Sequence, residues 1–494
     1  MKWSRKHSSD SDTATAVSGR QQPSAEVKGE KTYGTQTVTP ATEQGSEFEA
    51  SGQNKGNADA VWGDVGEGGP NYRSLGWIRA AVLETKTQIG LGVLGLPAVL
   101  DTLGFVPGMI VIIAMAVIIT WTDYVIGTFK LNHPHVYSLG DVGEIFFGRV
   151  GREIWGFSYW LMLTAIAASG FLSFSIALNA VSSHGTCTVV FVAVAAIVVF
   201  LVASIQTLSK ISWLGWVGLV SILSAVITLA ISVGVQDRPS AAPQNGPFFK
   251  DVQTVGHPTF IDFMNAVNTV LFAYAGTPNF MPIVSEMKLT KPTDYSKSVI
   301  LCQTFVTVVY CVIGGVTYHY TGKYIASPAL GSAGPLLKKV CYGIAIPGLL
   351  VGSLLNSHLG SKFLFVRALG GTRHLSSNTK THNIVWYGTV AANCVIAFVI
   401  AEAIPVFSDL LSIIGAILGT FLCIQTETFM WIYDNVRNQR TRNWYLLMAM
   451  NIIFNLIGWF IMGAGTYAAV MQIKADVGAG NKTSPFSCAN NSGN

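Results

Sequence analysis

The sequence has little charge, since only 12% of its 494 residues are Asp, Glu, Lys or Arg, against roughly 25% in ordinary soluble domains. A soluble enzyme needs more charge to cover its surface, so that class is disfavoured. The net charge of +5 is spread along the whole chain, which excludes a concentrated patch for nucleic acid. The seven cysteines include no CxxC pair, so a zinc module or a dense disulfide scaffold is not expected.

Apolar residues make up 50% of the chain, and from Trp77 onward they form stretches with short polar breaks between them. A membrane helix needs about 20 mostly apolar residues to cross about 30 Å of hydrocarbon. We count eleven such stretches and therefore expect an all-α polytopic membrane protein with about 11 transmembrane helices. The approximate spans are 77–101, 105–130, 154–181, 187–205, 211–235, 259–287, 297–320, 341–367, 383–404, 406–431 and 444–472.

The two ends of the chain differ from this membrane domain, residues 77–472. Residues 1–76 are rich in Ser, Thr, Gly, Gln and Glu and hold only isolated apolar residues. This composition is typical of disorder, so we predict a disordered cytoplasmic tail. Its Ser, Thr and Lys residues would suit modifying enzymes or a ubiquitin ligase as partners, with a passive tail as the alternative. Residues 473–494 form a short tail on the other side of the membrane.

The distribution of basic residues predicts the orientation. Fourteen Lys and Arg fall on the side of the N-terminal tail and seven on the opposite side, which places the N-terminus in the cytoplasm. An odd number of spans then places the C-terminus outside the cell or in a lumen. The chain holds two N-x-[ST] sequons, at Asn481 and Asn490, and both lie in the C-terminal tail. They are candidate glycosylation sites, and their position agrees with this orientation.

Three cysteines would lie on or near the oxidising side, namely Cys187, Cys341 and Cys488. A disulfide among them is an open alternative, and free thiols are the expectation.

Two of the spans contain helix-breaking residues near their centres. The first holds three glycines and a proline in the run Gly90-Leu-Gly-Val-Leu-Gly-Leu-Pro97, and the sixth holds Gly276-Thr-Pro278. Proline lacks the N–H group that a helix needs, and glycine has no steric preference for the helix. Lipid offers no water to satisfy freed backbone groups, so such breaks must face protein or a wet cavity. We predict that both spans open into half-helices, with ordinary kinks as the alternative.

The two interruptions lie five spans apart, as an inverted repeat of spans 1–5 and 6–10 would place them. Paired broken helices of this kind indicate the binding site of a transporter. The N-terminus of a half-helix carries a partial positive charge that suits a carboxylate, and freed carbonyl groups suit an ammonium group. A small zwitterion such as an α-amino acid would fit both.

The order and spacing of four motifs add a resemblance over roughly Trp77 to Met471. They are Gly90–Pro97, Tyr137-Ser-Leu-Gly-Asp-Val-Gly-Glu-Ile-Phe-Phe-Gly-Arg149, Phe272-Ala-Tyr-Ala-Gly-Thr-Pro278 with Glu286-Met-Lys288, and Gly322-Lys-Tyr-Ile-Ala-Ser-Pro-Ala329. The chain resembles the amino acid/auxin permease family, and within it the fungal neutral amino acid permeases of the methyltryptophan-resistance type.

This resemblance implies a leucine-transporter-type 5+5 inverted repeat with one extra C-terminal helix, and secondary active uptake of amino acids by alternating access. It implies that the substrate binds the unwound parts of helices 1 and 6. The residues carried over are Ile89, Gly90, Leu91, Gly92, Phe272, Ala273, Tyr274, Ala275, Gly276 and Thr277. Fungal relatives are generally coupled to protons, whereas some animal relatives use sodium.

Ionisable residues at membrane depth are functional candidates because they are costly there. Lys86 lies in the first span, Glu286 at the inner end of the sixth, and His358 in the eighth. We expect Lys86 to contact Glu286, with His358 extending the pair, and to serve in ion coupling. The alternative is a structural ion pair that fixes helix packing, with Glu84 and Lys362 at the inner water boundary.

We therefore predict an importer of neutral aliphatic or aromatic L-amino acids by proton symport. Phe272 and Tyr274 flank the second break, and the break holds no acidic residue, which favours neutral side chains. No cofactor, metal, catalytic residue or nucleic-acid partner is expected; the partners are the amino acid, the proton and the lipid bilayer. The plasma membrane is the expected location. The alternatives are a sodium-coupled or vacuolar carrier of the same fold, and an amino acid sensor that does not transport.

Overall fold

A computed structural model describes residues 75–206, 213–288, 293–370, 372, 374, 379–478 and 484–492. Over these residues the chain is nearly all helical and forms no strand, apart from one isolated bridge between Leu75 and Met287. The predicted tail 1–76 lies almost entirely outside the described residues, as does the sequon at Asn481.

Eight of the described helical segments are long and apolar enough to cross a membrane. One of them, Phe407–Asn435, is composite, because two π-helical turns (Gly415–Gly419 and Phe421–Gln425) separate α13 (Phe407–Ile414) from α14 (Thr426–Asn435). The others are α3 (Phe105–Asn132), α4 (Leu139–Ser182), α7 (Leu214–Val235), α10 (Thr293–Thr321), α11 (Pro335–Leu369), α12 (Lys380–Ala403) and α15 (Arg442–Gly478).

The three other predicted spans consist of shorter helices. The fourth is α5 (Thr188–Ala203). The first divides into α1 (Trp77–Gln88), a 3-10 turn and α2 (Leu96–Leu103), and the sixth into α8 (Phe260–Ala273), a 3-10 turn and α9 (Phe280–Glu286). Each of the eleven predicted stretches therefore falls on helix, and the two predicted to be interrupted are interrupted.

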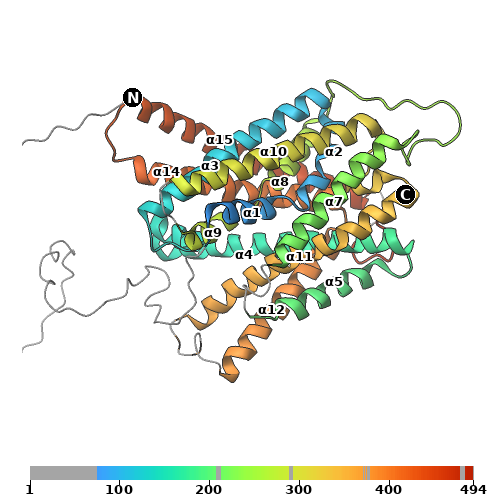
Figure 1. Cartoon of the computed structure of the whole chain (residues 1–494). Coiled ribbons are helices and arrows are strands. Elements are labelled where there is room, and N and C mark those ends of the chain that lie inside the picture. Colours follow the sequence, from blue (N-terminus) through green and yellow to red (C-terminus); the bar gives the residue numbers. More distant parts are fainter. Residues whose placement is uncertain are drawn as a thin grey trace, which may run out of the picture. The chain divides into compact units, whose positions relative to one another are not determined.

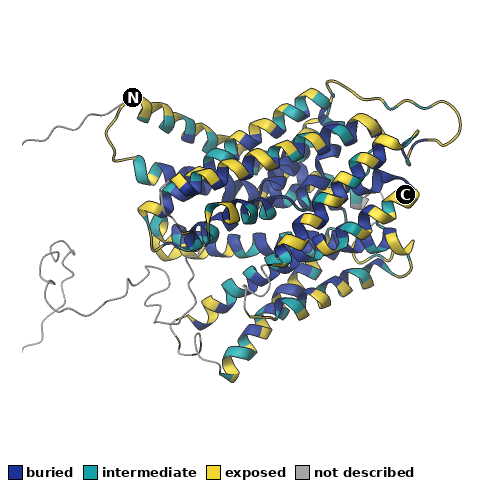
Figure 2. Ribbon diagram, in the orientation of Figure 1, coloured by how far each residue is buried: buried dark blue, intermediate teal, exposed yellow. Residues whose placement is uncertain are grey.

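The long helices run side by side, with the short helices α1, α8 and α9 among them (Figure 1). Burial separates the helices at the centre of the bundle from those at its periphery (Figure 2). In the apolar 18-residue stretch of α4, 83% of the residues are buried, against 17% in that of α15. The exposed positions of the outer helices are largely apolar, for example Ile110, Ile113 and Val117 on α3. An apolar exposed surface is what contact with lipid tails requires.

The third span begins with a short helix and a sharp turn. The backbone of Ser138 donates to the carboxylate of Asp141 at 2.8 Å, which fixes the start of α4. The backbone then leaves the helical region at Phe147 and Gly148, where Gly148 has a φ of 61°. Glycine tolerates this left-handed conformation, so the Tyr137–Arg149 motif folds as a short helix leading into the span.

The C-terminal residues 484–492 return to the C-terminal end of α4 and the N-terminal end of α5 and are linked there by a disulfide between Cys187 and Cys488. Thr188 Oγ1 donates to the carbonyl of Ala489 at 2.6 Å, and Asn179 Nδ2 donates to Asn491 Oδ1 at 2.8 Å. The expectation of free thiols is thus wrong for this pair.

The third cysteine of the expected group is not part of this bridge, because Cys341 is a buried free thiol. Composition gave no sign of the pairing, since it depends on the tail folding back across the bundle. In the same tail, the side-chain oxygen of Asn490 accepts a hydrogen bond from the backbone of Ser492 at 2.9 Å.

The disulfide predicts how the two pieces of a cleaved protein migrate on a gel. A protease site inserted between α7 and α8, in loop 237–258, would separate the piece with Cys187 from the piece with Cys488. We expect the two pieces to migrate together on a denaturing gel without reductant, because the disulfide joins them, and to separate when it is reduced.

The variant Cys488→Ser should separate without reductant, and Cys341→Ser should behave as the unmodified protein. Separation of the unmodified protein without reductant would contradict the pairing.

Candidate functional site

The first break lies between α1 and α2. The N–H of Ile89 still bonds to the carbonyl of Thr85 at 2.8 Å, but its own backbone is extended, with φ −74° and ψ 102°. A 3-10 turn, Gly92–Leu94, then leads to α2. Within the described part of the chain, the N–H groups of Gly90 and Leu91 donate to no acceptor. Free N–H groups just before a helical turn form the kind of site that binds a carboxylate.

The second break lies between α8 and α9. Residues Tyr274–Gly276 form a turn, and Thr277–Asn279 form a 3-10 turn that includes Pro278. Proline cannot donate within the helix, so the chain leaves the helical path here. Phe272, Tyr274 and Thr277 are buried, with exposures of 6%, 0% and 0%.

The two breaks pack directly against each other. A Cβ placed on Gly92 would lie 2.3 Å from the Cα of Ala273, and one placed on Gly276 would lie 2.6 Å from Gln88 Cγ. Only glycine permits approaches this close. The structure therefore brings together the two predicted segments, Ile89–Gly92 and Phe272–Thr277.

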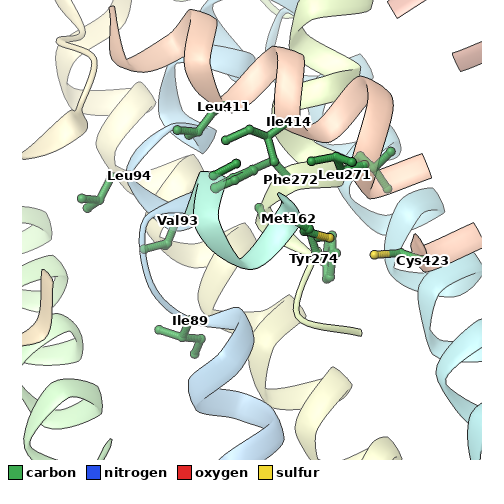
Figure 3. Packing of buried hydrophobic residues seen from close by; sticks show 14 of the residues in the cluster. Ile89, Val93, Leu94, Met162, Leu271, Phe272, Tyr274, Leu411, Ile414 and Cys423 are labelled. Carbon is green, nitrogen blue, oxygen red and sulfur yellow. The ribbon is translucent and has the colours of Figure 1, made fainter. Parts of the chain in front are cut away.

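Apolar side chains surround this contact (Figure 3). Ile89 and Val93 extend from the first break, Phe272 lies at the second, and Leu411 and Ile414 come from α13. All five side chains are at most 6% exposed. The backbone of the breaks is thus shielded from lipid by protein.

A tyrosine of α10 joins the two breaks. The hydroxyl of Tyr310 lies 2.9 Å from the carbonyl of Gln88 and 2.7 Å from the carbonyl of Ala273, so it can donate to either break. The ring of Tyr310 meets that of Tyr274 edge to face at 5.1 Å, and the Tyr274 hydroxyl donates to Thr307 at 3.3 Å. Sequence reasoning missed Tyr310, because its role depends on which face of α10 meets the breaks.

A polar cavity of about 140 Å³ reaches the first break from the end of the bundle where the C-terminal tail lies. It lies between α2, α8, α13 and α15, with Gly95 at the break and with Asp262 and Asp409 among its carboxylates. The amide and hydroxyl groups that line it are those of Thr102, Asn265, Thr269, Ser327, Ser408, Ser412 and Gln472. The cavity meets the first break at Gly95, after the 3-10 turn, and is not lined by Gly90 or Leu91.

The predicted contact between Lys86 and Glu286 is wrong. The bridge between Leu75 and Met287 places Glu286 level with the start of α1, where the N–H of Leu75 bonds to its carbonyl at 3.2 Å. Lys86 lies eleven residues further along, or about 16 Å at 1.5 Å per residue. Glu286 instead lies within electrostatic range of Lys362 on α11.

Lys86 faces α7. Methyl groups placed on Gly215 and Gly218 would lie 3.1 Å from its Cδ and 3.4 Å from its Cε, so the two glycines form a groove for the lysine stem. Among the described residues the ammonium group has no hydrogen-bond or ion-pair partner.

The third member of the predicted group, His358, is also apart from the other two. Its Nδ1 lies 3.1 Å from the carbonyl of Ala203, and its ring meets Trp386 at 5.3 Å. His358 therefore packs between α11, α5 and α12, away from the breaks.

Three other acids are fully buried instead. Glu84 on α1, Asp123 on α3 and Glu427 on α14 are each 0% exposed, which contradicts the alternative that put Glu84 at the water boundary. Asp123 and Glu427 lie inside predicted spans, so the rule that singles out ionisable residues at membrane depth applied to them as well. Sequence reasoning did not apply it there.

These features define a class of protein: an integral membrane transporter whose two interrupted helices meet inside a bundle of long apolar helices. Residues 73–471 match the family described as transmembrane amino acid transporter protein. The chain belongs to this family, which confirms the resemblance seen in the sequence, and the family is one of transporters and not of enzymes.

Named relatives agree with this assignment. An N amino acid transport system protein of Neurospora crassa is 35% identical over 432 residues, covering 86% of this chain and 90% of the relative. A transmembrane transporter of Fusarium pseudograminearum is 33% identical over 426 residues, covering 86% and 89%. Another of Gibberella moniliformis is 34% identical over 426 residues, covering 86% and 90%.

The close approach of the breaks predicts the effect of single methyl groups. The variants Gly92→Ala and Gly276→Ala would force the breaks apart, because the new Cβ atoms overlap Ala273 and Gln88. Overpacking of this kind costs about 1–3 kcal/mol. We expect uptake of labelled amino acids to fall severely while the protein still reaches the membrane.

Two matched glycines serve as controls. A Cβ on Gly90, in the same break, and one on Gly343, on α11, would meet no atom within 4 Å. We expect Gly343→Ala to keep normal uptake and Gly90→Ala to keep normal thermal stability. Equal stability and uptake of Gly92→Ala and the unmodified protein would contradict the packing described.

Proposed function

We propose that this protein imports neutral L-amino acids, aliphatic or aromatic, by proton symport with alternating access. The observation that carries the proposal is the contact between the two breaks, at Gly92 with Ala273 and at Gly276 with Gln88. Membership of an amino acid transporter family and a relative named as an N amino acid transport system protein support the substrate class.

The carboxylate of the substrate would bind the free N–H groups of Gly90 and Leu91. The partial positive charge at the start of a helical segment favours an anion there. The ammonium group would face carbonyl groups of the second break, within the segment Phe272–Thr277. Both ends of an α-amino acid would then be recognised by backbone groups, which leaves the side chain to set selectivity.

Selectivity for neutral side chains would follow from the surroundings of the breaks. Apolar groups such as Ile89, Val93 and Phe272 lie at the breaks, and no acidic residue lies within either one. Asp262 and Asp409 line the cavity that leads to the first break and would disfavour acidic substrates by charge repulsion.

Lys86, Glu286 and His358 lie apart, so they would not act as one relay. Lys86 remains a candidate for coupling by itself, because its stem lies in the glycine groove of α7 and its ammonium has no partner among the described residues. A cation fixed there would occupy the place that a coupling ion takes in sodium-driven carriers of the same fold.

The orientation proposed is a cytoplasmic N-terminus and an extracellular C-terminus in the plasma membrane. Disulfides persist in oxidising compartments, so the bridge between Cys187 and Cys488 supports placing the C-terminal tail outside. The excess of basic residues on the opposite side supports the same orientation.

Substrate selectivity can be measured by competition. In cells that lack their own amino acid uptake, we expect unlabelled leucine, phenylalanine or tryptophan to inhibit uptake of labelled leucine more strongly than lysine or glutamate does. The physical reason is that an apolar pocket cannot solvate a charged side chain. Preferential uptake of arginine would refute the neutral pocket, and binding without uptake would favour an amino acid sensor.

The driving ion can be identified by gradients. We expect uptake to be faster at acidic than at neutral external pH and to be lost with a protonophore, because the inward proton gradient supplies the free energy. Replacing external sodium with choline should leave uptake unchanged. Dependence on sodium would instead favour a sodium-coupled carrier, and a fluorescent fusion at the vacuole would favour a vacuolar one.

A further inference from the structure

The three buried acids form one group beside the second break. Asp123 on α3 lies in the middle, within electrostatic range of Glu84 on α1 and of Glu427 on α14. The carboxyl groups come from three predicted spans, and all three are 0% exposed. They lie on the other side of the breaks from the polar cavity, since Glu84 precedes the first break and Gly95 follows it.

No cationic side chain compensates these acids in the described part of the chain. Gln303 Nε2 donates to the Asp123 carboxylate, Ser298 donates to Glu84 at 3.0 Å, and the Tyr295 hydroxyl donates to the backbone carbonyl of Asp123 at 2.8 Å. The titratable groups that face Asp123 from neighbouring helices are Glu84, Glu427, Tyr295, Cys302 and Cys423.

Neutral donors alone do not stabilise three charges inside a membrane. A buried carboxylate without a cation is strongly unfavourable, and neighbouring carboxylates raise that cost further. The group is therefore stable only when protons neutralise it. If the transport cycle removes a proton from this group of acids, a buried negative charge remains. That charge must be neutralised by a cation or by another proton.

Several polar atoms in this group have no hydrogen-bond partner. They include Asp123 Oδ1, Gln303 Oε1 and both carboxylate oxygens of Glu427, all buried. The Thr277 hydroxyl is 0% exposed and lies close enough to Asp123 to interact with it, but it makes no hydrogen bond of standard geometry. Buried groups are normally paired, so these atoms mark a place where something is bound or exchanged.

The spacing of the acids favours a proton over a metal ion. Among the described residues, no three His, Cys, Asp or Glu side chains lie close enough to hold one metal ion. A proton needs only one carboxylate oxygen and a neighbouring acceptor, and the Asp123 carboxylate beside Thr277 supplies both.

We propose that Asp123, between Glu84 and Glu427, binds the coupled proton, and that Thr277 links this site to the second break. An O–H bond forms at the Asp123 carboxylate when a proton arrives from the outer side. It breaks when the proton leaves to water on the inner side. Because Thr277 belongs to the segment proposed to bind the amino acid, a change at Asp123 reaches the substrate through one residue. This inference rests on the proposed proton symport.

The test uses the full chain in proteoliposomes and compares two assays. The first measures uptake of labelled leucine driven by an imposed pH gradient. The second measures exchange of labelled for unlabelled leucine without any gradient. For Asp123→Asn we expect gradient-driven uptake to fall to the level seen without a gradient, whereas exchange remains measurable. Asp123→Glu should restore part of the response to the gradient.

Controls separate this inference from the proposed function. Glu144→Gln removes an exposed carboxylate that pairs with Arg152 at 3.2 Å and should respond to the gradient as the unmodified protein does. If the unmodified protein ignores the pH gradient, proton symport itself is wrong. If it responds and Asp123→Asn responds equally, the proton site is overturned.

The same assays cover two further outcomes. If Asp123→Asn does not fold, as judged by size-exclusion chromatography, the variants Glu84→Gln and Glu427→Gln test the proton site instead. Loss or a shift of the pH response in either variant supports the site, and an unchanged response in both overturns it. Sodium-driven uptake that disappears in Asp123→Asn would overturn the assignment to a proton.

Discussion

A helix inside lipid has to satisfy its own backbone hydrogen bonds, and this constraint governs the centre of the molecule. Two helices break that rule at Gly90–Gly92 and Tyr274–Thr277. They remain stable because each break lies against the other and because Tyr310 reaches carbonyl groups of both. The polar backbone that such a structure exposes is confined to one place, shielded from lipid by apolar side chains. That place is where the proposed zwitterionic substrate would replace the missing hydrogen bonds.

The same constraint explains which glycines matter. A methyl group on Gly92 would overlap the backbone of Ala273, and one on Gly276 would overlap the side chain of Gln88, whereas Gly90 faces open space. Gly215 and Gly218 serve a different purpose, since they make a groove for the stem of Lys86. The glycines of the breaks therefore divide into those that permit close contact, Gly92 and Gly276, and Gly90, where a Cβ would meet no other atom.

Local features of the sequence were sufficient to predict the helices and the two breaks, because Gly, Pro and apolar length act within a few residues of themselves. Contacts between side chains of different helices could not be predicted from such local features. Lys86 and Glu286 carry opposite charges, but the bridge at Leu75 places them at different depths. The disulfide of Cys187 and the role of Tyr310 likewise depend on how distant segments meet.

The acids at Glu84, Asp123 and Glu427 and the polar cavity at Gly95 approach the same pair of breaks from opposite sides. Under the proposed mechanism, a ligand on one side would change the backbone that the other side contacts, through Thr277 or through Gly95. Linkage requires that the effect of each ligand on the affinity for the other be equal. A transporter gains its coupling from such reciprocity, and in the described part of the chain the two proposed sites share the backbone of the two interrupted helices. Any mutation that separates the breaks should therefore weaken binding and coupling together, whereas a mutation confined to the acids should weaken coupling alone.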